Sequence, residues 1–160
     1  MTRSTKTEHF LNNQQFVDAE RHYKRHCFWA LVLFLFVIAT DQITKYWAVA
    51  HLPETTLNRG ISWSLFDSDS TMVFCAVSFC IGLFILFFSW YVYRFYRARQ
   101  SLWGAALVLA GALGNMLDRF VVGGVIDFIA LSWGGIAWPV FNVADVAICC
   151  GVFYLVVTNE

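Results

Sequence analysis

The chain has 160 residues, of which 59% are apolar and 18% aromatic, whereas only 14% are charged. A soluble globular protein of this length needs more polar side chains to cover its surface, so the composition indicates a membrane protein. The formal net charge is zero and no basic patch is present in the sequence, so no nucleic-acid partner is expected.

The apolar residues fall into four blocks, each close to the ~20 residues that a helix needs to cross a bilayer. No repeat or low-complexity segment interrupts them. We expect a cytoplasmic amino-terminal arm, residues 1–26, and one transmembrane domain, residues 27–158. The first block lacks a small-residue cleavage pattern and is interpreted as a retained span. The sequence therefore predicts an all-α membrane protein with four transmembrane helices, at residues 27–49, 71–93, 102–120 and 138–157.

The basic residues predict the orientation of the chain. Eight of the 11 Lys and Arg residues precede the first apolar block or lie between the second and the third. Because Lys and Arg in short loops stay on the cytoplasmic side, both termini are predicted to be cytoplasmic. The segments 51–70 and 121–137 are then external. The other three basic residues lie near carboxylates or in polar motifs: Lys45, Arg59 and Arg119.

Ionisable side chains in the apolar blocks all map to the external edge of the bilayer. Charged groups at this depth are costly and usually form pairs, face a cavity or carry function. Helical spacing groups them further, because residues three or four apart share a helix face. We therefore expect the polar faces to converge on one wet cleft. The pairs at this spacing are Asp41 with Lys45, Asn115 with Asp118, and Asn142 with Asp145, the last predicted about two turns into the fourth span.

These groups differ in how readily structure alone explains them. Asp41 and Lys45 could neutralise each other, and Asp118 could form a structural ion pair with the adjacent Arg119. Asp127 and Asp145 have no basic neighbour at helical spacing, so they are the strongest candidates for chemistry. Position and spacing alone leave two alternatives for them, hydrolysis and proton relay.

Two external segments complete the expected fold. Alternating apolar and polar residues at 61–65 predict a short strand, a β-like cradle for an extended peptide, after a turn at Asn58 and Gly60. The glycine-punctuated, apolar segment that carries Asp127 is expected to lie in the membrane interface. The five cysteines lack the spacing of a zinc site, and no metal site is predicted.

Five motifs, in this order, resemble those of the bacterial lipoprotein signal peptidase family, also called signal peptidase II. The resemblance covers residues 28–157. Two departures are visible. Ile61, Ser62 and Trp63 stand where many members have Ala-Ala-Phe, and Val146 stands where a smaller residue is frequent. The motifs read DQITKYWA from Asp41, NRGISWSLF from Asn58, GALGNMLDR from Gly111, VIDF from Val125 and FNVADV from Phe141.

The resemblance implies an aspartic endopeptidase whose catalytic pair is Asp127 and Asp145. It implies that the enzyme removes signal peptides from prolipoproteins, cutting before the diacylglyceryl-modified cysteine, without a cofactor. The implied location is the bacterial inner membrane, with the site on the external side. The implied partners are the prolipoprotein and membrane lipid, and a monomer is expected. Substrate-binding roles are implied for Asn58, Gly60, Asn115, Arg119 and Asn142, and structural roles for Asp41, Lys45 and Asp118.

Three other functions are less consistent with the sequence. A serine-type signal peptidase needs an external lysine as base, and the only candidate, Lys45, is spaced to pair with Asp41. A presenilin-like protease would carry YD and GxGD motifs, and neither string occurs. An ion-coupled transporter would place its carboxylates near the bilayer midplane between related repeats, whereas these residues cluster at one edge.

Overall fold

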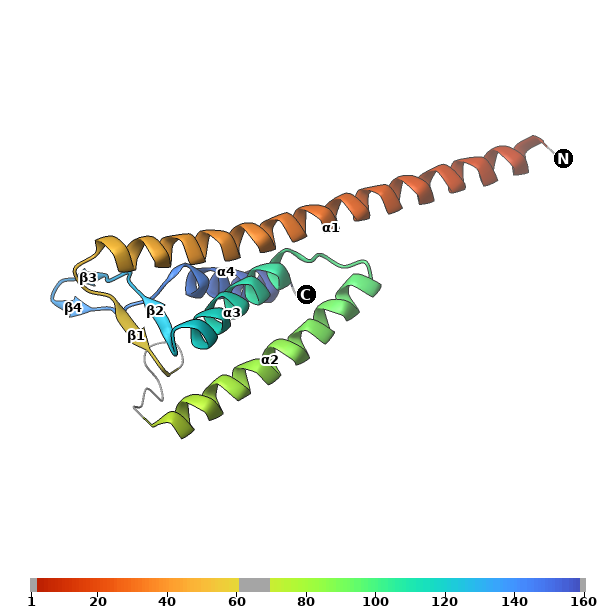
Figure 1. Ribbon diagram of the computed structural model, residues 1–160. Coiled ribbons are helices and arrows are strands. Elements are labelled where there is room, and N and C mark those ends of the chain that lie inside the picture. The colour runs from red at the N-terminus through yellow and green to blue at the C-terminus, as the bar shows by residue number, and fades with distance from the viewer. Residues whose placement is uncertain (1–2, 61–69, 159–160) are drawn as a thin grey trace.

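The computed structural model describes residues 3–60 and 70–158, with side chains from residue 14 onward. Over these residues the chain forms long helices and short strands (Figure 1). The helices are α1 (Arg3–His51), α2 (Thr71–Arg97), α3 (Trp103–Val121) and α4 (Val143–Thr158). The strands are β1 (Thr56–Asn58), β2 (Val125–Asp127), β3 (Ser132–Trp133) and β4 (Ile136–Ala137).

Three of the helices are long and apolar enough to cross a membrane, judged by length and composition: Gln14–His51, Thr71–Arg97 and Trp103–Val121. Helix α4 is also apolar, but its 16 residues span only ~24 Å at 1.5 Å per residue. The structure therefore confirms a largely helical membrane fold. Helix α1 continues without a break through the boundary predicted after residue 26.

The predicted start of the fourth span, residue 138, is wrong by five residues. Residues 138–142 pair instead with the preceding loop, because the Trp138 amide donates to the Leu131 carbonyl at 2.8 Å and the Phe141 amide donates to the Ile129 carbonyl at 3.1 Å. Pro139 has no amide hydrogen and does not favour a helix interior. Helix α4 therefore begins only at Val143.

The distribution of buried residues is reversed relative to that of a soluble protein. Large apolar side chains on the helices face outward, and Phe36, Phe87 and Phe153 each expose 65% or more of their surface. Polar side chains are buried instead: Asp41, Lys45, Asn58, Asp118, Arg119, Asp127 and Asn142. Such an extensive apolar surface is what a bilayer, rather than water, would cover.

Helix α3 lies at the centre of the bundle and packs against each of the other three helices (Figure 1). Small residues make this possible, since they let helix backbones approach closely in lipid. The tightest approach is to α4, where Gly104 faces Gly151 and Gly111 faces Ala144. Among the closer helix contacts, α2 packs only against α3.

All described strands lie together at one end of the helices (Figure 1). Strands β1 and β2 pair antiparallel, with Thr56 opposite Asp127 and Asn58 opposite Val125. Strands β3 and β4 form a hairpin whose turn residues, Gly134 and Gly135, have φ of 60° and 82°. Two glycines with positive φ suit the tight turns that match strand twist. The hairpin leaves Trp133 91% exposed.

The strand predicted at 61–65, including Trp63, lies outside the described residues. The observed strand β1 ends at Asn58, just before that segment. An extended segment therefore does lie beside Asp127, but it is formed by residues 56–58.

Close packing of α3 on α4 gives a stability prediction. A Cβ added by Gly111→Ala would contact the Ala144 carbonyl oxygen and lie 2.7 Å from Ile148 Cγ1. The two backbones must then separate, and we expect a loss of about 1–3 kcal/mol, seen as a lower thermal unfolding midpoint in detergent. Gly82→Ala is the matched control, because its Cβ would meet only Met116 Cε at 3.6 Å. Equal midpoints for the two variants would contradict the packing.

Candidate active site

A cavity of about 210 Å³ lies between the strands and the adjacent ends of the helices, and it brings together five residues predicted from the sequence. These are Asn58, Asn115, Arg119, Asp127 and Asp145. The remaining wall is apolar and consists of Ile81, Phe84, Ala112, Val125 and Ile148. A few convergent polar groups in an apolar cavity are typical of a ligand or catalytic site.

Asp127 ends strand β2 and is 3% exposed. Its Oδ2 accepts a hydrogen bond from Asn58 Nδ2 at 3.1 Å, and its Oδ1 accepts one from Asn142 Nδ2 at 2.6 Å. Burial raises the pKa of Asp127 to about 6, and the charge of Asp145 acts in the same direction, against the two amide hydrogen bonds. A carboxyl group with a raised pKa in a cavity is a candidate for acid–base chemistry.

Asp145 lies in the first turn of α4, not two turns into the helix as predicted, because the helix begins at Val143. Its backbone amide donates to Asn142 Oδ1 at 2.9 Å, and its Oδ2 accepts from the Asn142 amide at 3.2 Å. This reciprocal pattern is a capping box, which satisfies amides at a helix start. The cap fixes the Asp145 carboxylate, and the other oxygen accepts from Asn115 Nδ2 at 3.0 Å.

Asn142 is fully buried and connects the two aspartates. Its side-chain amide donates to Asp127 and its backbone amide to Asp145. The same side-chain amide lies 3.2 Å from Asn115 Oδ1. Asn142 is not among the residues that line the cavity, so it holds the carboxylates from behind. Asn142 and Asp145 were predicted to share one face of a helix. They form a helix cap instead, in which the two residues have the same spacing in sequence.

Lys45 forms a second polar cluster, which is joined to the cavity through Asn115. Its ammonium lies 2.8 Å from Asp41 Oδ2 and 2.7 Å from Asp118 Oδ2, and all three side chains are almost completely buried. It also donates to Asn115 Oδ1 at 3.0 Å. Asp118 on α3 therefore pairs with Lys45 on α1. The predicted alternative, a structural ion pair between Asp118 and its neighbour Arg119, is not observed. The predicted Asp41–Lys45 pair is confirmed.

Gln42 belongs to the same cluster, and the sequence analysis missed it. Its side-chain amide donates to Asp118 Oδ1 at 3.0 Å and lies 3.2 Å from Asp41 Oδ2. The available signal was a polar residue beside Asp41 in an apolar span. Asp41 Oδ1 also accepts from the Ala144 amide at 2.9 Å, so the cluster joins α1 to the start of α4.

Arg119 lines the cavity, and its guanidinium holds the end of the β1 segment. It donates to the Arg59 carbonyl at 3.1 Å and also to the Gly60 carbonyl. The Gly60 amide donates to Asn58 Oδ1 at 2.9 Å, which closes a turn of the kind predicted. Gly60 itself does not line the cavity. Its turn positions Asn58, which contacts Asp127.

The Lys45 cluster yields a stability prediction. Lys45→Met leaves Asp41 and Asp118 buried without their cation, and breaking a buried pair in this way typically costs about 3–5 kcal/mol. We expect a much lower unfolding midpoint in detergent. Arg21→Gln is the control, because its ion pair with Asp18 is exposed to solvent and should contribute little. A wild-type midpoint for the Lys45 variant would show that the cluster is not needed for stability.

Comparison with known proteins places this arrangement in a family. A family model described as Signal peptidase (SPase) II matches residues 33–159. The lipoprotein signal peptidase of Thermodesulfovibrio yellowstonii is 33% identical over 136 residues, covering 77% of this chain and 88% of the relative. That of Syntrophomonas wolfei subsp. wolfei is 34% identical over 138 residues, covering 78% of this chain and 87% of the relative.

The fold also matches a solved structure, that of a bacterial membrane enzyme determined by the in meso method at 2.3 Å resolution. The TM-score is 0.63 at 23% identity, over 81% of this chain and 85% of the other. The family match includes every residue of the cavity and of the Lys45 cluster. By this match and by its relatives, the chain belongs to the signal peptidase II family.

Proposed function

We propose that the protein is a membrane aspartic endopeptidase that removes signal peptides from diacylglyceryl-modified prolipoproteins, cutting before the lipid-modified cysteine. Family membership supports a protease that processes lipoproteins. The observation that carries the choice of catalytic residues is Asn142, which donates to both Asp127 and Asp145 behind one cavity. Two carboxyl groups held by one residue and facing one space are suited to activating a water between them.

The proposed reaction uses one proton shared by the pair. We assign that proton to Asp127, because burial, with the charge of Asp145 acting in the same direction, raises its pKa to about 6. Asp145, held by Asn115 and by the helix cap, takes a proton from water, which attacks the scissile carbonyl carbon. Asp127 donates to the carbonyl oxygen. The tetrahedral intermediate then collapses, the C–N bond breaks, and the leaving nitrogen receives a proton from the dyad.

The lipid part of the substrate has a matching surface. An apolar groove of about 670 Å³ runs between α2 and α3, lined by residues such as Phe79, Leu83 and Phe120. Arg119 lines both this groove and the cavity of the aspartates. We infer that the acyl chains lie in the groove while the extended peptide crosses the cavity beside β1, where strand addition can provide backbone hydrogen bonds.

The proposed function also implies how the helices and strands are oriented in the membrane. We propose that α4 is the fourth span of an inner-membrane protein, with both termini cytoplasmic and the strands on the external side, as the basic residues predict. We also propose that the protein acts as a monomer. Proposed supporting roles are substrate and aspartate positioning for Asn58, Gly60, Asn115, Arg119 and Asn142, and structural stabilisation for Asp41, Lys45 and Asp118.

Replacing either aspartate tests the proposed chemistry. Asp127→Asn and Asp145→Asn preserve shape but remove the group that exchanges protons, and we expect each to lower kcat at least about 10²-fold. The assay follows the gel shift of a lipidated prolipoprotein with purified enzyme. Glu54→Gln is the control, because this exposed carboxylate follows α1 outside the cavity. Wild-type processing by both variants would exclude the dyad, and loss of substrate-coupled proton flux in liposomes without loss of processing would indicate a transporter.

The pH dependence tests which aspartate holds the proton. A pKa of about 6 for Asp127 predicts that kcat/KM falls as pH rises through about 6, since the shared proton is then lost. Asn58→Ala removes a hydrogen bond that favours the charged form, so the falling limb should move to higher pH. The folded protein also keeps this proton where the unfolded chain has released it, so this group lowers stability as pH rises from 3.8 to about 6. A limb that moves to lower pH would contradict the assignment.

A further inference from the structure

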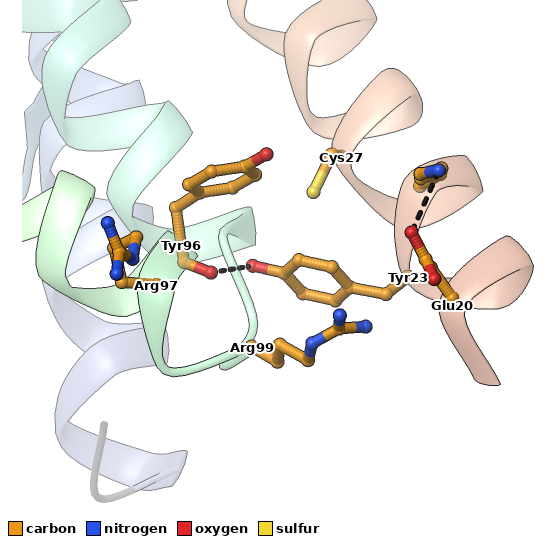
Figure 2. Close-up of a pocket in the computed structure, with 7 residues that line it drawn as sticks. Glu20, Tyr23, Cys27, Tyr96, Arg97 and Arg99 are labelled. Atoms are coloured by element: carbon orange, nitrogen blue, oxygen red, sulfur yellow. Dashed lines mark hydrogen bonds and ion pairs between the residues drawn. The ribbon is translucent and has the colours of Figure 1, made fainter. Parts of the chain in front are cut away.

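The end of the bundle opposite the strands holds a cavity that the proposed peptidase function does not use. It has a volume of about 310 Å³. It lies between the amino-terminal part of α1, up to Cys27, which we call the α1 extension, and the end of α2 with the turn that leads to α3 (Figure 2). Helix α1 contributes Tyr23, Lys24 and Cys27, the last turn of α2 contributes Tyr96 and Arg97, and the turn to α3 contributes Arg99. Glu20 completes the wall.

Two specific hydrogen bonds join α1 to the chain around the α2–α3 turn, one of them between residues that line the cavity. The Tyr23 hydroxyl donates to the Tyr96 carbonyl at 3.0 Å (Figure 2). The Leu102 amide donates to His26 Nε2 at 3.0 Å. Both join residues more than 70 positions apart in sequence. The α1 extension is therefore fastened to the α2–α3 turn, and the space between them is part of the fold.

The charge of the cavity is positive. Its wall carries three cations, Lys24, Arg97 and Arg99, against one carboxylate, Glu20. Glu20 is ion-paired to Lys24 at 2.9 Å. Within the described ranges, neither Arg97 nor Arg99 has a carboxylate within ion-pair distance. Two guanidinium groups without an anionic partner are suited to binding phosphate.

Arg99 follows the C-cap of α2 and closes the helix, because its amide donates to the Tyr96 carbonyl at 3.2 Å and the Gln100 amide donates to the Phe95 carbonyl at 3.0 Å. The φ of Arg99 is 56°, the only positive φ of a non-glycine residue in the described chain. Left-handed geometry is uncommon for such residues. The guanidinium carbon lies 5.7 Å from the centre of the Tyr23 ring, and Figure 2 shows Arg99 beside that ring. The turn thus holds the Arg99 head at the cavity.

The position of the cavity along the helices indicates that the phosphate belongs to a membrane lipid. The apolar stretch of α1 begins at Cys27, and the exposed Phe28 and Trp29 follow directly. On α2, the exposed Trp90 and Tyr93 come just before the arginines. Aromatic belts and basic residues together mark the headgroup level of a membrane. We propose that this cavity binds the phosphate headgroup of an anionic phospholipid, and that this is a role of the long α1 extension.

The test titrates phosphatidylglycerol into the full-length protein in detergent and counts bound lipid by native mass spectrometry, with phosphatidylcholine as the neutral comparison. We expect saturable retention of phosphatidylglycerol only, weakened about fivefold by either Arg97→Gln or Arg99→Gln. Arg99→Lys should restore retention, because it keeps the charge. Arg25→Gln removes the same charge from an exposed position outside the cavity and should leave retention unchanged. Thermal midpoints without lipid confirm that the variants are folded.

Three results would overturn the proposal. Equal retention of the two lipids would show that the cavity does not select charge. An equal loss in the Arg25 and Arg99 variants would show a diffuse surface attraction instead of a site. Displacement of the lipid by soluble glycerol phosphate at the same concentration would show that the cavity takes a free phosphate and not a membrane lipid.

Discussion

The ammonium group of Lys45 is the contact on which the polar interior depends. It lies between Asp41 on its own helix and Asp118 on α3, in a region that excludes water. Removing three charges from water is expensive, and only close pairing with further hydrogen bonds offsets that cost. Lys45 also donates to Asn115, whose amide then faces Asp145. The ion cluster around Lys45 therefore helps to position the candidate catalytic carboxylate of Asp145 through Asn115.

Much of the site could be predicted because charge in an apolar span is so costly. Asp41, Lys45 and Asp118 stood out against their surroundings, and the helical spacing of Asp41 and Lys45 corresponds to a real contact. Asp127 and Asp145 stood out because they had no local partner, and the structure places both in one cavity. The order of the motifs then indicated the family, which the comparisons confirm.

The remaining features depend on contacts between segments far apart in sequence, which spacing along one helix does not encode. Lys45 pairs with Asp118 on another helix, and the Gln42 side chain reaches the same carboxylate across the two helices. The start of α4 was misplaced because an apolar run does not show where backbone amides pair with a loop. Pro139 and the cap formed by Asn142 and Asp145 mark that boundary, but the spacing of the two cap residues also fits a helix face.

The β3–β4 hairpin has a consequence for the depth at which the proposed catalytic pair lies. Its exposed Trp133 is the kind of side chain that settles at the interface between lipid and water. The hairpin follows β2 after a few residues, and the pairing of Ile129 with Phe141 ties this stretch to the start of α4. The level at which the indole ring comes to rest therefore sets the level of Asp127 and Asp145. In the proposed reaction, the protein and not the substrate would then set the distance of the cleaved bond from the membrane surface.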